Sequence, residues 1–156
     1  MSTAVHTDRK RLGVRLLTPE GPVFEGSAYM VIAPSVLGEV GILPRHAPLI
    51  AFLKTGETRL KLPDDTERVF ATTEGYLSVE EDQLLILVEQ ADDATTIDRA
   101  RADAALRRAE EALANVGDDD VARVAAESAR RRAENRLRAA DKVGGRSGTP
   151  PQPRSS

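Results

Sequence analysis

The sequence predicts two structural units in one chain, an N-terminal antiparallel β-sandwich followed by a C-terminal antiparallel two-helix hairpin. Residues 11–93 contain short apolar or alternating runs separated by turn residues, whereas residues 97–142 contain 14 alanines and no proline. The charge changes as well, because the first segment has 7 basic and 14 acidic residues and the second has 11 basic and 10 acidic residues. A break in both propensity and charge indicates two domains of different class.

The first segment has the pattern of a β-sandwich or barrel. Leu12, Val14 and Leu16 alternate with other residues, which is typical of a strand buried on one face. Turn sequences at residues 63–65 and 80–82 separate later runs as hairpins. No helical pattern intervenes, so a Rossmann-type arrangement is not predicted. The expected strands cover residues 12–16, 23–24, 29–33, 42–43, 49–53, 58–62, 67–72, 76–79 and 84–88.

The second segment begins with a predicted helix that ends near Val116. We expect Thr95 or Thr96 to cap this helix, with Asp98 in its first turn, where the helix dipole favours an anion. Gly117 is placed to stop the helix, because glycine readily adopts the left-handed conformation that follows many helix ends.

A second helix is predicted from the acidic run at residues 118–120 to about Val143. The seam between the two helices consists mainly of alanines spaced by three and four residues. Burying an alanine methyl contributes about 1 kcal/mol or less, against about 1.5–3 kcal/mol for a leucine. We therefore expect a closely packed but weakly held and mobile hairpin. Residues 1–10 are expected to form an N-terminal extension, and residues 143–156 a disordered tail.

The composition excludes several classes of function. The chain has no cysteine, and its histidines lie only at positions 6 and 46, which excludes thiol catalysis and metal sites built from thiolates or several histidines. The aromatic content of 3% and the net charge of −3 argue against a nucleic-acid partner. The acidic residues fall mainly in turns, which gives an enzyme with paired carboxylates little support. Apolar runs such as residues 84–88 are too short for direct membrane insertion, and the start lacks a secretory signal.

The densest local signal is residues 38–49, which read GEVGILPRHAPL. Its two glycines and two prolines specify turns and rigid corners. This stretch resembles the GELGILPGHAPL signature of the ε subunit of bacterial F-type ATP synthases, the homologue of the mitochondrial δ subunit. The resemblance covers roughly residues 11–142, in order. It continues through residues 17–24, 53–56, 74–79 and 97–102, the last of which match the family's I/L-D-x-x-R-A motif.

The chain departs from the family pattern at two places. Arg45 stands where the family usually has glycine, which adds bulk and charge beside His46. The family's Ser-Gly-Gly is replaced by Thr73, Glu74 and Gly75. Neither change removes a hydrophobic core position, so the predicted fold is unaffected.

The resemblance implies a non-catalytic rotor subunit. Members of the family have a flattened sandwich of ten strands that binds the γ subunit and sits on the c-ring, which couples proton-driven rotation to ATP synthesis. Glu39 matches the acidic loop residue that faces the c-ring, and Arg45 and His46 lie in the neighbouring loop facing the rotor partners. Taken alone, Glu39 also fits an exposed turn carboxylate. The implied location is the cytoplasmic face of the bacterial cell membrane, reached through the complex.

The resemblance also implies a regulatory ATP, although no cofactor is required. Some bacterial ε subunits bind one ATP between the helices without hydrolysing it, through residues that match Asp98, Arg101, Arg108, Arg132 and Arg136. Guanidinium groups suit phosphate because they bind it in a bidentate manner. The chain has no Gly-rich phosphate loop, so it is not predicted to be a P-loop ATPase. The same arginines also fit a solvated helix face with pairs such as Glu127 with Arg131 and Glu134 with Arg138.

A third role follows from the charge of the second helix. Residues 121–142 carry 7 basic and 3 acidic residues, including Arg130, Arg131 and Arg132. In the family, the raised hairpin contacts an acidic loop on the catalytic β subunits of the α/β assembly and inhibits ATP hydrolysis. Opposite charge on the two surfaces favours such a contact. The alternative is an exposed helix whose charges only maintain solubility.

A different class of function stays open at this point. A free-standing β-sandwich binding module with a helical adaptor hairpin also explains the composition break and the lack of catalytic groups. It does not explain the ordered run of matching motifs.

Overall fold

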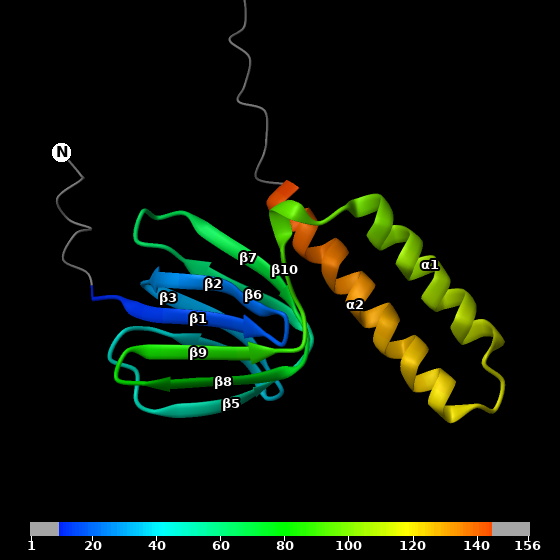
Figure 1. Ribbon diagram of the computed structural model, residues 1–156, viewed down its shortest axis with the longest axis horizontal. Helices are drawn as coiled ribbons and strands as arrows, with labels where there is room; N and C mark the ends of the chain where they lie inside the picture. Colours follow the sequence, from blue (N-terminus) through cyan, green and yellow to red (C-terminus); the bar gives the residue numbers. More distant parts are fainter. Residues whose placement is uncertain (1–9, 145–156) are drawn as a thin grey trace, which may run out of the picture.

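The computed structural model describes residues 10–144, so most of the expected N-terminal extension and the tail beyond Gly144 lie outside the described residues. Ten strands form a sandwich, and two helices extend from one end of it (Figure 1). The strands are β1 (Leu12–Thr18), β2 (Gly21–Ala28), β3 (Met30–Ser35), β4 (Gly38–Ile42), β5 (Leu49–Leu53), β6 (Gly56–Lys61), β7 (Glu67–Thr72), β8 (Gly75–Glu80), β9 (Gln83–Val88) and β10 (Ala91–Asp93). A 3₁₀ turn (Ala94–Thr96) then leads into α1 (Arg99–Asn115) and α2 (Asp120–Gly144).

The strands form one hydrogen-bonded path in the order β10-β7-β6-β3-β5-β8-β9-β1-β2, and β4 pairs with β3 off this path. Among the described strands, β1 and β9 pair in parallel and the other pairs are antiparallel. The predicted sandwich and hairpin are therefore confirmed, with one parallel pair added. A parallel pairing needs a long connection between its two strands, and here the paired strands lie near the start and near the end of the domain.

The two predicted hairpin turns are present. Glu81 and Asp82 join β8 to β9 with φ values of 50° and 62°, which is the type I′ geometry that matches the twist of the flanking strands. In the turn between β6 and β7, Asp64 accepts hydrogen bonds from the hydroxyl and the backbone N–H of Thr66, at 2.5 and 3.0 Å. These bonds favour the charged carboxylate and lower the pKa of Asp64.

One strand is longer than expected, and another was not expected from the sequence. Only residues 42–43 were expected as a strand and residues 38–41 were interpreted as turn-rich, but β4 spans Gly38–Ile42 and pairs with β3, and its Ile42 is buried opposite Val31. Gly38 and Gly41 interrupt the apolar and polar alternation of β4, so the sequence pattern does not indicate a strand. The other strand, β10, has three residues, too few to show a period of two.

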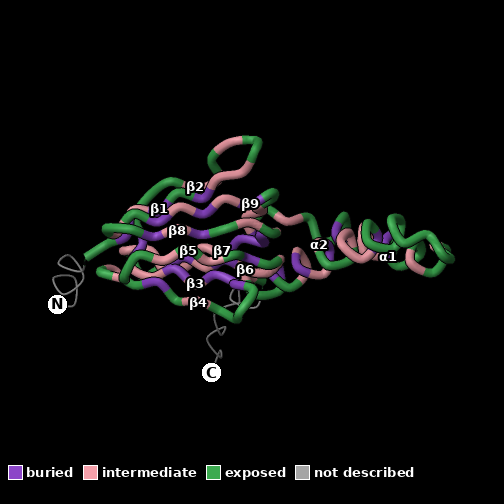
Figure 2. Tube along the Cα trace, turned by 90° about the horizontal axis from the view of Figure 1, so that it is seen from below, coloured by how far each residue is buried: buried purple, intermediate pink, exposed green. Residues whose placement is uncertain are grey.

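The core of the sandwich is almost entirely aliphatic, as the low aromatic content predicts. Buried residues alternate with exposed ones along the strands (Figure 2). Phe70 is the largest fully buried side chain, and Phe24 packs against it at 6.2 Å between ring centroids. Leucines, isoleucines and valines fill the rest of the core.

The start of α1 differs from the prediction. Thr95 and Thr96 do not cap it, because Ile97 is extended and separates their 3₁₀ turn from the helix. Asp98 is the N-cap instead, and its carboxylate accepts a hydrogen bond from the Arg101 N–H at 3.1 Å. An aspartate satisfies free N–H groups in the cap position as well as in the first turn.

The end of α1 and both ends of α2 follow the sequence more closely. Gly117 has a φ of 57° directly after α1, as expected of a helix stop. Asp119, from the acidic run, caps α2 by accepting a hydrogen bond from the Ala122 N–H at 3.0 Å. The helix continues through Val143 and Gly144, so these two residues do not belong to the tail predicted from residue 143, and the rest of that tail lies outside the described residues.

The hairpin meets the sandwich through one helix. In Figure 1, α1 packs on α2, and α2 passes the ends of β6 and β7. Within residues 10–144, no helix is both long enough and apolar enough to cross a membrane.

Gly75, the retained glycine of the altered family motif, is a sharp test of the packing between β8 and β9. A Cβ at this position would overlap the carbonyl oxygen of Leu87, which belongs to the facing strand. We expect Gly75→Ala to destabilise the fold by about 2–4 kcal/mol, measured by urea unfolding. Gly41→Ala is the control, since its Cβ would meet only the Met30 methyl at an ordinary 3.5 Å. Equal effects of the two changes would contradict this account.

Candidate functional site

Glu39 lies on the short strand β4 and is held by an ion pair. The Arg59 guanidinium donates to its carboxylate at 2.7 Å, reaching across β3 from β6. The Glu39 side chain remains 64% exposed, whereas that of Arg59 is 23% exposed. The carboxylate is therefore positioned by the sheet and still accessible from solvent.

Arg45 and His46 form a corner that the backbone fixes. The Arg45 N–H donates to the Asp82 carboxylate at 2.6 Å, which ties the loop to the turn between β8 and β9. Arg45 adopts a φ of 68°, the left-handed conformation that glycine tolerates best. The Nδ1 atom of His46 lies 2.6 Å from the Ala47 carbonyl oxygen, so the imidazole is held by its own loop. The corner thus presents an exposed cation beside a half-buried histidine.

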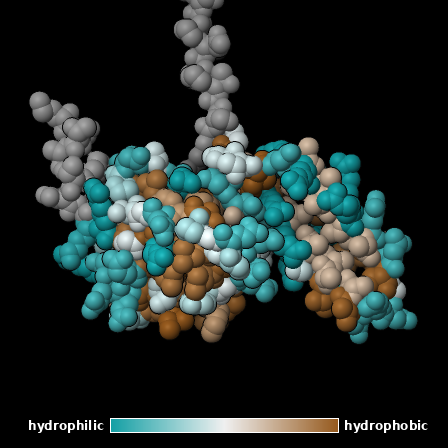
Figure 3. Space-filling model, in the orientation of Figure 1, coloured by the Kyte–Doolittle hydropathy of each residue, from teal (hydrophilic) through white to brown (hydrophobic). Residues whose placement is uncertain are grey.

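A hydrophobic surface, interrupted by Ser78 between Ile50 and Leu85, covers one outer side of the sandwich. Its members, which we call the apolar face, are the outward-facing side chains of Ile50, Phe52, Tyr76, Leu85 and Leu87. Cross-strand pairing places Phe52, Tyr76 and Leu87 in one row over β5, β8 and β9. The exposed fractions of Ile50 and Phe52 are 70% and 68%, and Figure 3 shows hydrophobic side chains gathered over these strands. Exposed patches of this kind mark interaction sites.

The apolar face was missed when the candidate site residues were chosen from the sequence. The signal was present, because residues 49–53 read LIAFL and residues 84–88 read LLILV, apolar on both faces of each strand. A strand with solvent on one side alternates between apolar and polar residues. Continuous apolar runs near the outside of a sandwich therefore indicate a surface that another molecule covers.

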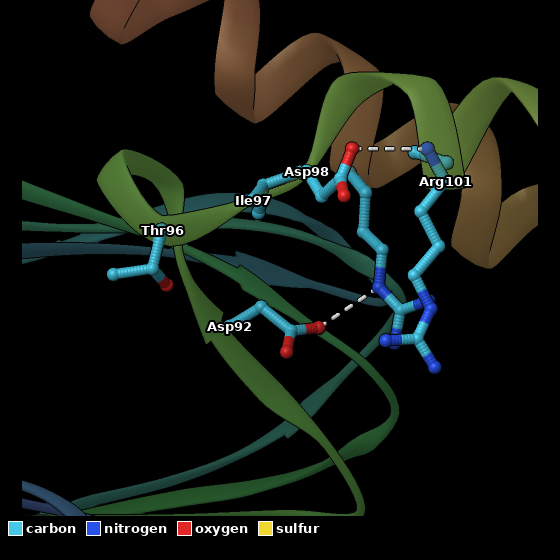
Figure 4. A pocket seen from close by; sticks show the side chains of 7 residues that line it. Asp92, Thr96, Ile97, Asp98 and Arg101 are labelled. Atoms are coloured by element: carbon cyan, nitrogen blue, oxygen red, sulfur yellow. Dashed lines mark hydrogen bonds and ion pairs between the residues drawn. The ribbon is translucent and has the colours of Figure 1, made fainter.

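A pocket of about 350 Å³ lies between the sandwich and the start of the hairpin. Figure 4 shows Asp92, Asp98 and Arg101 around it. Arg136 of α2 also lines this pocket. The Arg136 guanidinium is paired with the Asp92 carboxylate at 2.9 Å. The structure thus brings together three of the five residues matched to the ATP site, Asp98, Arg101 and Arg136, and places a second carboxylate among them.

The remaining two residues of that set lie elsewhere. Arg108 and Arg132 line a groove of about 490 Å³ between α1 and α2, which is otherwise formed largely by alanines and also reaches Arg136. Arg132 donates to the Ser128 hydroxyl at 2.8 Å. Arg136 therefore connects the pocket and the groove, but the five side chains do not surround one volume.

The three consecutive arginines of α2 do not form a single surface. Successive residues of a helix point about 100° apart because the helix has 3.6 residues per turn. Arg130 pairs with Glu134 at 3.8 Å, Arg131 is exposed, and Arg132 lines the groove between the helices. A partner that binds one side of α2 meets at most two of them.

The junction between the two units is held by Asp93. Its carboxylate accepts hydrogen bonds from Thr95, at 2.9 Å from the backbone N–H and 2.7 Å from the hydroxyl, and from Arg68 at 2.6 Å. Burial raises the pKa of Asp93, but these bonds outweigh it and leave the pKa below its usual value. The last strand is thereby joined to the turn that starts the hairpin.

Arg45 is expected to lower the stability of its own loop. Glycine has no Cβ to oppose a φ of 68°, so we expect Arg45→Gly to stabilise the fold by about 0.5–1 kcal/mol after its greater unfolded-state entropy is included. Arg45→Ala is the matched control, because it removes the guanidinium and keeps the Cβ. Both are measured by urea unfolding, and equal stabilities of the two variants would contradict the explanation.

Comparison with known proteins agrees with the motifs. Residues 11–94 match the family model described as ATP synthase, Delta/Epsilon chain, beta-sandwich domain, and residues 95–141 match its long alpha-helix domain. The ATP synthase epsilon chain of Bacillus velezensis is 44% identical over 129 residues, covering 82% of this chain and 96% of the relative. That of Nitrosococcus oceani is 42% identical over 130 residues, covering 83% and 88%.

A solved structure shares the fold. A chain from the Euglena gracilis mitochondrial ATP synthase, in a structure of OSCP, F1 and the c-ring, superposes with a TM-score of 0.72 at 19% identity. The match covers 83% of this chain and 81% of that one. The sequence matches span both units of the chain, which therefore belongs to the delta/epsilon family of ATP synthase, the non-catalytic subunit that its motifs predict.

Proposed function

We propose that the chain is a rotor subunit of a bacterial ATP synthase and binds the γ subunit through its apolar face. The observation that carries this proposal is the row of large hydrophobic side chains left uncovered by the described chain. Phe52 and Ile50 are each more than two-thirds exposed. Contact of these apolar side chains with water is unfavourable in free energy unless a partner covers them. A contact of this composition suits an assembly partner that stays bound, because permanent interfaces are more hydrophobic than transient ones.

Strand β4 and the loop at residues 43–48 are proposed to face the c-ring. They offer the Glu39 carboxylate, paired with Arg59, and the Arg45 cation, whose backbone N–H is bonded to Asp82. Such charged groups are suited to bind the polar loops of a partner ring, because complementary charge fixes the orientation of the two proteins. In this proposal the chain couples c-ring rotation to γ and lies at the cytoplasmic face of the membrane, held there through the complex.

The hairpin is proposed to regulate the complex. Its alanine-rich seam and its limited contact with the sandwich suit an element that changes position, and the basic α2 suits the acidic surface of the catalytic subunits in α/β. A free-standing adaptor module is no longer favoured, given the family to which the chain belongs.

A regulatory ATP is the second candidate role, favoured by the pocket at Asp98, Arg101 and Arg136. Its volume of about 350 Å³ lies within the usual range of ligand sites. Two arginines converge there, but Asp92 and Asp98 oppose a triphosphate. Binding would require Arg136 to leave Asp92, so any affinity should be modest.

The γ contact can be tested by replacing two residues of the apolar face. We expect the double variant Ile50→Gln, Phe52→Gln to weaken the 1:1 complex with a recombinant γ subunit about a hundredfold, because buried aromatic anchors dominate interfaces. Size-exclusion chromatography measures co-elution. Val121→Gln is the control, since Val121 is 82% exposed but lies at the far end of α2. Unchanged co-elution of a folded double variant would contradict the proposed γ surface.

The nucleotide role is tested by calorimetric titration of ATP. We expect weak binding by the natural chain, and about 10–100-fold weaker binding by Arg101→Ala, since a charge-assisted hydrogen bond is lost. Arg107→Ala is the control, because Arg107 is exposed on the same helix and does not line the pocket. No heat for the natural chain at millimolar ATP would end this proposal.

A further inference from the structure

The apolar contact between the hairpin and the sandwich is small. Ala139 of α2 is fully buried against Val69 and Ala71 of β7 and Ala94 of the 3₁₀ turn. Ile97 and Val143 pack at the margin of this cluster. Three of the four buried side chains are alanines, so the hydrophobic contribution is limited and gives little directional preference.

Two ion pairs cross the same contact, and both are partly solvated. Arg136 pairs with Asp92 at 2.9 Å, and Lys142 pairs with Glu57 at 2.5 Å. The cationic side chains are 34% and 47% exposed. The Asp92 side chain is 39% exposed, so its pair contributes little to stability and is screened by salt, whereas the Glu57 side chain is 14% exposed and its pair is screened less. The two pairs do not by themselves fix the position of the helix.

Asn135 makes the specific contact. Its side chain is almost completely buried, and its Nδ2 atom donates to the carbonyl oxygens of Gly56 at 2.8 Å and Thr72 at 3.1 Å. Gly56 and Thr72 face each other across β6 and β7. One amide group therefore uses both of its protons to join α2 to the ends of two adjacent strands.

The same residue also limits how tightly the helix is held. The Oδ1 atom of Asn135 is buried, and no hydrogen-bond partner for it is found among the described residues. Docking removes this oxygen from water without replacing the lost hydrogen bond, which is unfavourable. On the sandwich side, the Gly56 oxygen keeps another donor, the Thr72 hydroxyl at 3.3 Å. Undocking therefore restores solvent to the amide and does not leave this strand end without a partner.

We propose that Asn135 is a latch that holds the hairpin in register against the sandwich and that its unpaired oxygen keeps the latch releasable. The regulatory consequence rests on the proposed role of the hairpin, whereas the latch is a property of the isolated chain. Asn135 acts by positioning α2, and its two donated hydrogen bonds supply the direction that the alanine contacts lack.

The latch can be measured on the full chain in solution. Because the sequence has no cysteine, spin labels can be attached specifically to Ser27→Cys on the sandwich and Ala114→Cys near the end of α1, both exposed positions. Pulsed electron paramagnetic resonance then reports the distance distribution between the two units. The unmodified latch should give one dominant docked population.

Two latch variants are compared with a matched control. Asn135→Ala removes both donors, and Asn135→Asp replaces the donor with an oxygen that faces two carbonyl oxygens. We expect the ratio of undocked to docked hairpin to rise about tenfold or more in each, as the loss of two hydrogen bonds implies. Asn115→Asp makes the same chemical change at an exposed position at the end of α1, and it should leave the docked population unchanged.

The outcomes separate the latch from its proposed use. If Asn135→Ala and the chain with Asn135 have equal docked populations, the proposed latch is wrong. If Asn135→Asp loses the sheet signal in circular dichroism, that variant is unfolded and the test rests on Asn135→Ala alone. A shift in Asn135→Ala with retained sheet signal supports the latch. If the latch opens as expected but ATP hydrolysis by the reconstituted complex is unchanged, the regulatory role of the hairpin fails while the latch stands.

Discussion

The parallel pairing of β1 with β9 attaches β1 and β2 to the rest of the sheet, next to the turn that holds the loop of Arg45 and His46. The turn at residues 81–82 is the fastening point, since the Asp82 carbonyl oxygen accepts from the Gly13 N–H at 2.8 Å and its carboxylate holds the Arg45 N–H. The first strand, the last long hairpin and the loop of Arg45 and His46 are thereby fixed together. The row of side chains over β5, β8 and β9 is set by the direct pairing of these three strands.

The two outer sides of the sandwich differ in the size of the side chains they present. On the side toward the hairpin, Val69 and Ala71 pack against Ala139 of α2. The other side offers Phe52, Tyr76 and Leu87. Small side chains give a contact that forms and breaks at low cost, whereas large ones favour a lasting association. The chain thus combines an internal contact suited to the proposed undocking of the hairpin with a surface suited to a permanent external one.

Much of the fold was predictable because its determinants are local. Alternation along residues 12–16, the turns at residues 63–65 and 80–82, and Gly117 after α1 each act over a few residues. The Asp98 cap was missed because Thr95, Thr96 and Asp98 are all suitable N-cap residues within four positions of one another. The apolar face and the Asn135 contact depend on pairing between distant segments, such as the 79 residues that separate Gly56 from Asn135. Sequence spacing predicted which arginines belong to the hairpin, but not that Arg108 and Arg132 lie in a different groove from Arg101.

The edges of the sheet bear on how such a chain survives before it finds its partners. Both ends of the strand path leave backbone groups open to pairing with another chain, which is a route to aggregation. One edge strand, β10, has only three residues, two of them aspartates, and the other, β2, carries Pro22 and Glu25. Short length, proline and charge all discourage strand addition. A chain with an exposed apolar face is therefore protected at these two edges, where uncontrolled association could otherwise begin.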